Sequence, residues 1–246
     1  MALMEPRWVD THAHVDRYSP VERVALLERA REAGVLVVAV GVDVASSRVA
    51  LNTAGLAGVV AGVHPLRASE WDAAGPGELA GAPGVVGIGE CGFDGAGPEW
   101  AVQAGAFRGQ CELARAVGLP LVLHIDGPGA WEALMEHGDA LDGLTVVRHY
   151  FAGGREQADW HAERGHFLSF GRPLLRRAEL QAICRGYPPE RILAETDSYP
   201  LGGRTTEPRD VVAIGEMVGR LRGWTGEEAR RRLWENSLRA FPGIGG

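Results

Sequence analysis

Six residues at or just after the ends of apolar stretches are of the types that bind metal ions in proteins. They are His12, His14, Glu90, His124, His149 and Asp197. His12 and His14 are two positions apart, so in a strand both side chains point to the same side and one cation can bind both. Imidazole combined with carboxylate suits transition metals better than Ca. The residue types therefore predict a site for divalent metal ions, with Zn, Mn, Mg or Ni as candidates.

The size of this set predicts two ions. Four histidines and two carboxylates are too many for one tetrahedral ion, but they fit two ions about 3.5–4 Å apart that share a carboxylate. The chain contains no lysine, since all 25 of its basic residues are arginine, so a carboxylated lysine cannot be the bridge and Glu90 is the candidate. Such a pair of ions activates a hydrolytic water, with Asp197 as general base or proton shuttle and Glu90 as the second catalytic residue.

Each histidine taken alone has a more ordinary explanation, because a single histidine at a strand end is usually a structural or loop residue. The grouping favours the metal site, since clustering ionisable groups costs free energy of desolvation that packing alone does not repay. His64, which also ends a predicted strand, is expected to support the ligands or the structure. His137, His161 and His166 are expected to be surface residues.

The elements that position these residues alternate between strands and helices. Eight apolar stretches are predicted strands: 7–11, 35–42, 58–63, 85–89, 119–124, 145–149, 167–170 and 192–195. Most are apolar almost without interruption, as in parallel strands that are buried on both faces. The pattern favours a (β/α)8 TIM barrel, an α/β fold, forming one domain over residues 1–246, because barrel active sites lie at the carboxyl ends of the strands. An open doubly wound sheet is the alternative.

Local signals indicate where three helices begin and which side they bury. Ser19 and Glu22 form a capping box, with Val21, Val24, Leu27 and Ala30 as the expected apolar face and Gly34 as the end. A helix over 100–117 is expected to bury Phe107, Cys111, Ala114 and Val117. Thr225 and Glu228 form a second capping box, which opens the last helix.

The composition limits the classes of function. The 246-residue chain is 46% hydrophobic and carries a net charge of −7, which gives no support for non-specific binding to nucleic acid. Three cysteines without CxxC spacing do not make a disulfide framework. No stretch approaches the length of a membrane span and the amino terminus does not resemble a signal peptide. We therefore expect a cytoplasmic protein with no membrane partner and an undetermined oligomeric state.

Taken in order, several segments resemble the motifs of the TatD-like metal-dependent hydrolases, which include deoxyribonucleases. The resemblance covers nearly the whole chain: DTHAHVD at 10–16, GVHP at 62–65, GIGECGFD at 87–94, LPLVLH at 119–124, RHYFAG at 148–153, LAETDS at 193–198 and NSLRAF at 236–241. It implies a distorted TIM barrel with two divalent metals. His12, His14, Glu90 and Asp197 would hold the first ion, while Glu90, His124 and His149 would hold the second.

The resemblance also implies the reaction, hydrolysis of a phosphodiester in DNA or a small molecule. Arg204 and Glu207 are the expected substrate-binding residues, with Arg148, Arg172, Arg176 and Arg177 as further sources of positive charge. Where the family often has arginine two residues after the strand-five histidine, this chain has Asp126, which repels phosphate. Hydrolysis of a small ester, amide or lactone is therefore the alternative, and a binding barrel without catalysis is a more remote one.

Overall fold

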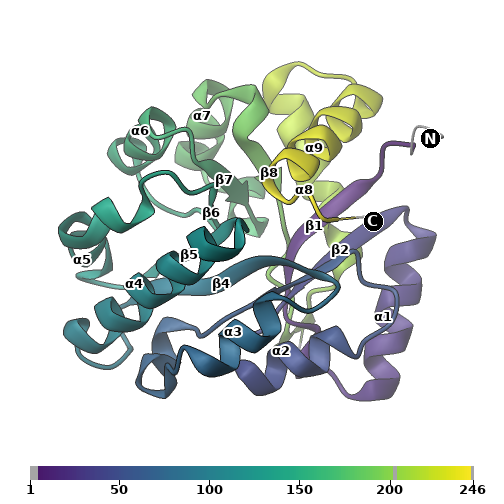
Figure 1. Cartoon of the computed structure of the whole chain (residues 1–246). Coiled ribbons are helices and arrows are strands. Elements are labelled where there is room, and N and C mark those ends of the chain that lie inside the picture. Colours follow the sequence, from purple (N-terminus) through teal and green to yellow (C-terminus); the bar gives the residue numbers. More distant parts are fainter. Residues whose placement is uncertain (1–4, 202–203, 245–246) are drawn as a thin grey trace. The chain divides into compact units, whose positions relative to one another are not determined.

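The computed structural model describes residues 5–201 and 204–244. The chain divides into two compact units, Met1–Val38 with Tyr150–Pro242 and Ala39–His149 with Gly243–Gly246. Strands and helices alternate along the chain (Figure 1). The single domain expected over residues 1–246 stays a prediction, and each unit is considered by itself below.

Eight strands make up the main sheet, in the order β1 to β8. They are β1 (Trp8–Ala13), β2 (Val35–Val40), β3 (Gly58–Ala61), β4 (Val85–Asp94), β5 (Leu121–Asp126), β6 (Val146–Arg148), β7 (Phe167–Phe170) and β8 (Ile192–Ala194). Strands β3 to β6 pair in parallel, as do β7 and β8. This sequential order is that of a (β/α)8 fold and excludes the doubly wound alternative, in which the strand order reverses at a switch point.

Nine α-helices lie among the described residues, most of them following a strand. They are α1 (Pro20–Glu32), α2 (Val44–Leu51), α3 (Ala74–Ala80), α4 (Trp100–Val117), α5 (Ala130–His137), α6 (Arg155–Glu163), α7 (Ala178–Gly186), α8 (Val211–Arg222) and α9 (Gly226–Ala240). Short 3-10 turns and an antiparallel pair, β9 (Pro200–Leu201) with β10 (Arg204–Thr205), complete the elements. No described helix meets the length and apolarity needed to cross a membrane.

The apolar strands are buried, as their sequence pattern predicts. Every described residue of β1, β3, β6, β7 and β8 is buried. The three cysteines, Cys91 in β4, Cys111 in α4 and Cys184 in α7, are also buried and form no disulfide. Large aromatic side chains are fully buried, among them Phe93 and Phe107, whose ring centroids lie 5.2 Å apart. Burial of this apolar surface is the main force that holds each strand in place.

The predicted capping boxes are confirmed in part. Ser19 and Glu22 form the full reciprocal box at the start of α1, and Thr225 accepts a hydrogen bond from the Glu228 backbone at the start of α9. Gly34 follows the end of α1 with φ +71°, a conformation that suits glycine.

The predicted buried faces are partly wrong. In α1, Val21 is 80% exposed and Val24 is 59% exposed, while Leu26, Leu27 and Ala30 face the core. The spacing of every third residue drifts around a helix of 3.6 residues per turn, so Val21 leaves the side that Ala30 occupies. In α4, Phe107, Cys111 and Ala114 are buried as predicted, but Val117 in the last turn is exposed.

Two of the histidines expected at the surface are buried. His161 in α6 and His166 before β7 lie with their Nδ1 atoms 3.0 Å apart, next to the Trp160 ring. Burial lowers the pKa of His166 to about 4. The surface prediction is wrong because the two Nδ1 atoms contact each other and both rings pack against the Trp160 indole, which offsets the cost of burying them.

Candidate metal centre

In the first unit, three of the predicted ligands lie together. The Nε2 atoms of His12 and His14 are 3.3 Å apart. The Asp197 carboxylate lies 3.3 Å from His14 Nε2 and 3.8 Å from His12 Nε2. Both imidazole rings are buried, and the Asp197 side chain is mostly so. We call His12, His14 and Asp197 the first trio.

Backbone hydrogen bonds join the segment that contains His12 and His14 to the segment that contains Asp197. The Asp197 N–H donates to the His12 carbonyl, and the His14 N–H donates to the Ser198 carbonyl. Asp197 has a φ of +50°, a left-handed conformation that aspartate tolerates better than most residues. The turn after β8 is therefore bent so that its carboxylate faces the end of β1. A sharp bend of this kind, at the end of a rigid strand, is where proteins place functional side chains.

The buried Asp10 side chain holds the end of β1 in place through hydrogen bonds. Its carboxylate accepts hydrogen bonds from the Thr196 N–H, the Thr196 hydroxyl and the His12 N–H. Burial raises the pKa of Asp10 well above its ordinary value, although these hydrogen bonds oppose the shift. Thr11 adds a link through its hydroxyl to the Ala194 carbonyl. Asp10 thus ties β1 to the residue before Asp197 and belongs to the scaffold of the first trio.

In the second unit, the other three predicted ligands also lie together. One carboxylate oxygen of Glu90 is 2.9 Å from His149 Nε2 and 3.5 Å from His124 Nδ1. The two nitrogens are themselves 2.9 Å apart. Glu90 and His149 are buried and His124 is nearly so. We call Glu90, His124 and His149 the second trio.

Glu90 owes its position to an irregularity in β4. Gly89 pairs with Val122 and Cys91 pairs with Leu123, so Glu90 is the extra residue of a β-bulge. Gly89 has a φ of +132°, and a Cβ placed there would lie 2.6 Å from the Val122 carbonyl oxygen. Only glycine fits such a position. A bulge re-aims the side chain that it carries, and here that side chain is the Glu90 carboxylate.

Two side chains outside the trio contact it. Asp94, at the end of β4, lies 3.2 Å from His124 Nε2 through a carboxylate oxygen, and this hydrogen bond is the main cause that lowers the pKa of Asp94. His64 Nε2 lies 3.8 Å from Glu90, while its Nδ1 accepts the Leu66 N–H. A carboxylate behind a ligating histidine orients the ring. The sequence motif contained Asp94, but no role was predicted for it. The supporting role expected of His64 stays a prediction, because His64, Glu90 and His124 also form a group that could hold a metal ion.

Glu195, two residues before Asp197, also lacked a predicted role. It is fully buried and accepts the Tyr150 N–H at 2.8 Å. Tyr150 has a φ of +42°, so the chain turns sharply at this residue, which follows His149 in the sequence. An acidic residue at the end of a predicted apolar strand, two positions before a predicted ligand, was the available signal.

Both trios fit a divalent cation. Ligands about 2.0–2.1 Å from one ion in tetrahedral or octahedral geometry lie about 3–3.5 Å from one another. The three distances are 3.3, 3.3 and 3.8 Å in the first trio and 2.9, 2.9 and 3.5 Å in the second. Two imidazoles and one carboxylate, a donor set typical of Zn or Mn sites, make up each trio.

Three of the residues expected to contact or attract substrate are Arg204, Arg148 and Glu207, and the structure places Arg148 and Glu207 in different environments. The side chain of Arg204 lies outside the described residues. Arg148 is buried and donates hydrogen bonds to the backbone carbonyls of His149 and Ile125. Its role in the structure is to stabilise the backbone there. Glu207 forms two hydrogen bonds with Arg29, at 2.7 and 2.8 Å, and an ion pair with Arg209. These contacts anchor the segment before α8 to α1, and a role for Glu207 in binding substrate stays a prediction.

The ion pair of Glu207 leads to a prediction on acid stability. Arg29 holds the pKa of Glu207 below its ordinary value of 4.5, so the pair stabilises the fold above that pH and loses its effect as the pH falls through the lowered pKa. We expect Glu207→Gln to lower the free energy of unfolding by about 1 kcal/mol at pH 7 and by much less at pH 3. Urea unfolding at both pH values measures this.

The matched control for that prediction is Glu78→Gln, because Glu78 pairs with Arg48 at 3.2 Å where both side chains are exposed. Its loss is expected to cost under about 0.5 kcal/mol at pH 7. An equal cost of Glu207→Gln at both pH values would contradict the assigned ion pair.

Comparison with known proteins identifies the family. The sequence model of the family described as TatD related DNase matches residues 9–242. The chain belongs to this family. Among the relatives of this chain, the uncharacterized metal-dependent hydrolase YabD of Bacillus subtilis is 28% identical over 94% of this chain and 98% of its own length. The 3'-5' ssDNA/RNA exonuclease TatD of Erwinia billingiae is 32% identical, over 89% of this chain and 93% of its own length.

Solved structures agree on the fold. The crystal structure of YjjV, a TatD homologue from Escherichia coli, superposes with a TM-score of 0.83 at 24% identity, covering 97% of this chain and 99% of that one. A TatD family hydrolase from Entamoeba histolytica gives 0.81 at 17% identity, with 97% and 99% covered. These structures confirm the predicted TIM-barrel fold, and the family match and the curated relatives confirm the predicted TatD-type, metal-dependent class of hydrolase.

Proposed function

We propose that this TatD family member hydrolyses phosphodiester bonds of single-stranded nucleic acid and holds two divalent cations, one on each trio. The observation that carries the proposal is the geometry of the two trios, each of which gathers two imidazole nitrogens and one carboxylate oxygen within 3.8 Å. The relatives named 3'-5' ssDNA/RNA exonuclease support the substrate class. Glu90 as the bridging ligand remains a proposal from the family resemblance.

The residues of the two trios divide the work of such a reaction. Bound divalent cations supply Lewis acidity at a phosphoryl oxygen and lower the pKa of water. Asp197 has the most exposed side chain of the first trio, at 19%, and its carboxylate is the group that we propose receives the proton of the attacking water. Glu90 is buried, so its negative charge would offset the positive charge of a cation held by the second trio. The remaining ligands, all histidines, bind in their neutral form.

A specific observation favours hydrolysis of a carboxylic ester, amide or lactone as the second candidate. Asp126, two residues after His124 on β5, is exposed, and a carboxylate there repels phosphate. Arg148, the nearest arginine to His149 in sequence, is occupied with backbone carbonyls. Neither residue offers a positive charge to a phosphodiester, whereas a neutral ester needs none.

Metal removal tests the proposal. The purified protein is expected to contain two divalent ions per chain and to cleave single-stranded DNA and an aryl phosphodiester. Dialysis against a chelator is expected to abolish cleavage, because the water loses its activation, and added Mn or Zn is expected to restore it. Elemental analysis and a gel-based cleavage assay, run in parallel with an aryl ester, measure these effects.

Three results would count against parts of this proposal. Cleavage of DNA that survives the chelator contradicts a metal-dependent reaction. Fewer than one ion per chain contradicts two loaded trios. Cleavage of the aryl ester with DNA left intact replaces the nuclease by the second candidate.

A further inference from the structure

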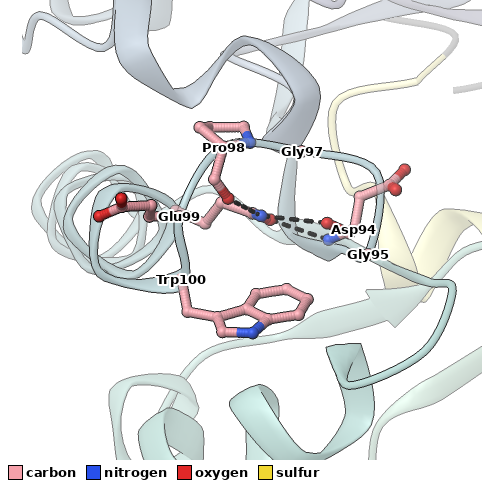
Figure 2. Close-up of a pocket in the computed structure, with 7 residues that line it drawn as sticks. Asp94, Gly95, Gly97, Pro98, Glu99 and Trp100 are labelled. Atoms are coloured by element: carbon pink, nitrogen blue, oxygen red, sulfur yellow. Dashed lines mark hydrogen bonds between the residues drawn. The ribbon is translucent and has the colours of Figure 1, made fainter.

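A pocket of about 400 Å³ opens beside the second trio, on the loop that joins β4 to α4. It is lined by Asp94, Gly95, Gly97, Pro98, Glu99, Trp100 and Gln103. The Trp100 ring forms one side of it and the loop at Gly97 and Pro98 lies across from the ring (Figure 2). The volume is within the range of about 300–1,000 Å³ that is typical of small-ligand sites.

The loop is held in one shape before any ligand arrives. Buried Gln103 accepts the Asp94 N–H and donates to the carbonyls of Asp94 and Pro98, contacts drawn in Figure 2. The Gly97 N–H also donates to the Asp94 carbonyl, and the Gly95 N–H donates to the Asp126 carbonyl. A preformed pocket loses less conformational entropy on binding than a mobile loop does.

Trp100 is the one large aromatic side chain of the lining and is 40% exposed. One edge of its indole packs towards Gly129, where a Cβ would lie 3.0 Å from the ring, and Phe93 lies 6.3 Å away between ring centroids. The ring is therefore supported in position while part of it faces solvent. Exposed tryptophan held rigidly is typical of surfaces that stack a planar partner.

The charges around the pocket restrict its occupant. The charged residues of the lining are Asp94 and Glu99, with no cation among them, and their carboxylates point to opposite sides, away from the indole (Figure 2). A phosphate would be repelled here, whereas an uncharged aromatic ring would not. The pocket also adjoins the second trio, because Asp94 is both a lining residue and the partner of His124 at 3.2 Å.

We propose that this pocket binds a nucleobase of the single-stranded substrate, stacked on the Trp100 indole, while the neighbouring phosphodiester lies at the metal ligands. The proposal rests on the proposed function and adds a base-binding subsite to it. The subsite does not distinguish one base from another, since every base offers a π face for stacking. It also explains how a chain with Asp126 near its ligands holds a nucleic acid, namely through a base rather than through added phosphate contacts.

The test compares Trp100→Ala, Trp100→Phe and the wild-type holoenzyme on two short oligonucleotides, one normal and one in which the terminal residue is an abasic tetrahydrofuran unit. For the normal oligonucleotide we expect Trp100→Ala to raise KM about tenfold and Trp100→Phe to raise it under about threefold, because phenylalanine still stacks. For the abasic oligonucleotide the three proteins are expected to have the same KM. Circular dichroism melts check that each variant is folded.

A direct binding measurement keeps the two proposals separate. Fluorescence anisotropy of the same labelled oligonucleotides in the presence of chelator reports the pocket without any cleavage. Weaker binding of the normal but not the abasic oligonucleotide by Trp100→Ala supports the subsite. Equal binding by all three proteins, or an equal loss on both oligonucleotides, overturns it. Failure of the wild type to cleave either oligonucleotide overturns the proposed function instead, and the binding result still decides the subsite.

Discussion

Glu90→Gln is expected to lower the rate of phosphodiester hydrolysis by a factor on the order of 10²–10⁴ while leaving the fold intact. The Glu90 carboxylate lies 2.9 Å from His149 and 3.5 Å from His124, so it supplies the negative charge of the second trio. Glutamine keeps the size and shape of the side chain but removes that charge. We therefore expect the metal content to fall from two ions per chain to one, measured by elemental analysis beside the steady-state rate.

The matched control for this change is Glu112→Gln. Glu112 is an exposed residue of α4, and the same chemical substitution there is expected to leave both the rate and the metal content unchanged. A Glu90→Gln protein that still binds two ions and cleaves at the wild-type rate would remove Glu90 from the site. A variant that binds two ions but is slow would assign Glu90 to the reaction and not to metal binding.

Gly89→Ala is expected to destabilise the protein by about 2–4 kcal/mol, the largest effect on stability among the changes considered. The new Cβ would meet the Val122 carbonyl oxygen at 2.6 Å, and the φ of +132° is strained for any residue but glycine. Relief of the clash must move β4 away from β5 or rotate the bulge. Either movement displaces Glu90, so activity is expected to fall more than the loss of folded protein explains. Urea unfolding and activity per folded molecule measure the two effects.

Gly105→Ala is the control for glycine replacement as such. Gly105 lies in the exposed part of α4 with open space where its Cβ would be, and alanine in a helix interior is favoured over glycine by about 1 kcal/mol. A stabilised Gly105→Ala beside a destabilised Gly89→Ala assigns the cost to the bulge. Equal stability of Gly89→Ala and the wild type would show that the bulge tolerates a side chain.

The sequence predicted the strands well because a strand buried on both faces is apolar throughout. β7 was predicted with its observed bounds, Phe167–Phe170, and β8 was predicted one residue too long. β4 continues to Asp94, well past the predicted end at residue 89, because its second half contains glycines and charged residues that do not resemble an apolar strand. The pairing of Phe93 and Asp94 with β5 holds that half in the sheet.

The helix faces were harder to predict, since a face is decided by what packs against it. Val21 and Val24 are apolar yet exposed, while Leu26 and Leu27 turn inward. The composition of α1 alone does not distinguish these choices, because apolar residues lie on more than one side of the helix.

For the candidate site, the family resemblance implied two sets of ligands that share Glu90, and their binding of metal stays a prediction; how each side chain is held could not be predicted. His12, His14 and Asp197 lie together in one unit, and Glu90, His124 and His149 lie together in the other. The bulge at Glu90 was signalled only by the glycines beside it. Arg148 is the last residue of β6 and directly precedes His149, and neighbouring residues of an extended chain point to opposite faces. That alternation predicts that Arg148 points away from the side on which His149 lies.

The burial of the three cysteines has a practical consequence for following the protein in solution. Burial raises the pKa of Cys91 well above its usual range and brings the pKa of Cys111 and of Cys184 to about 12. Alkylating reagents attack the thiolate, so the native chain should resist them, and labelling should wait for local opening. Because Cys91 directly follows Glu90 in β4, while Cys184 lies in α7 of the other unit, mass spectrometry of labelled peptides would time the opening of each unit separately, without any introduced probe.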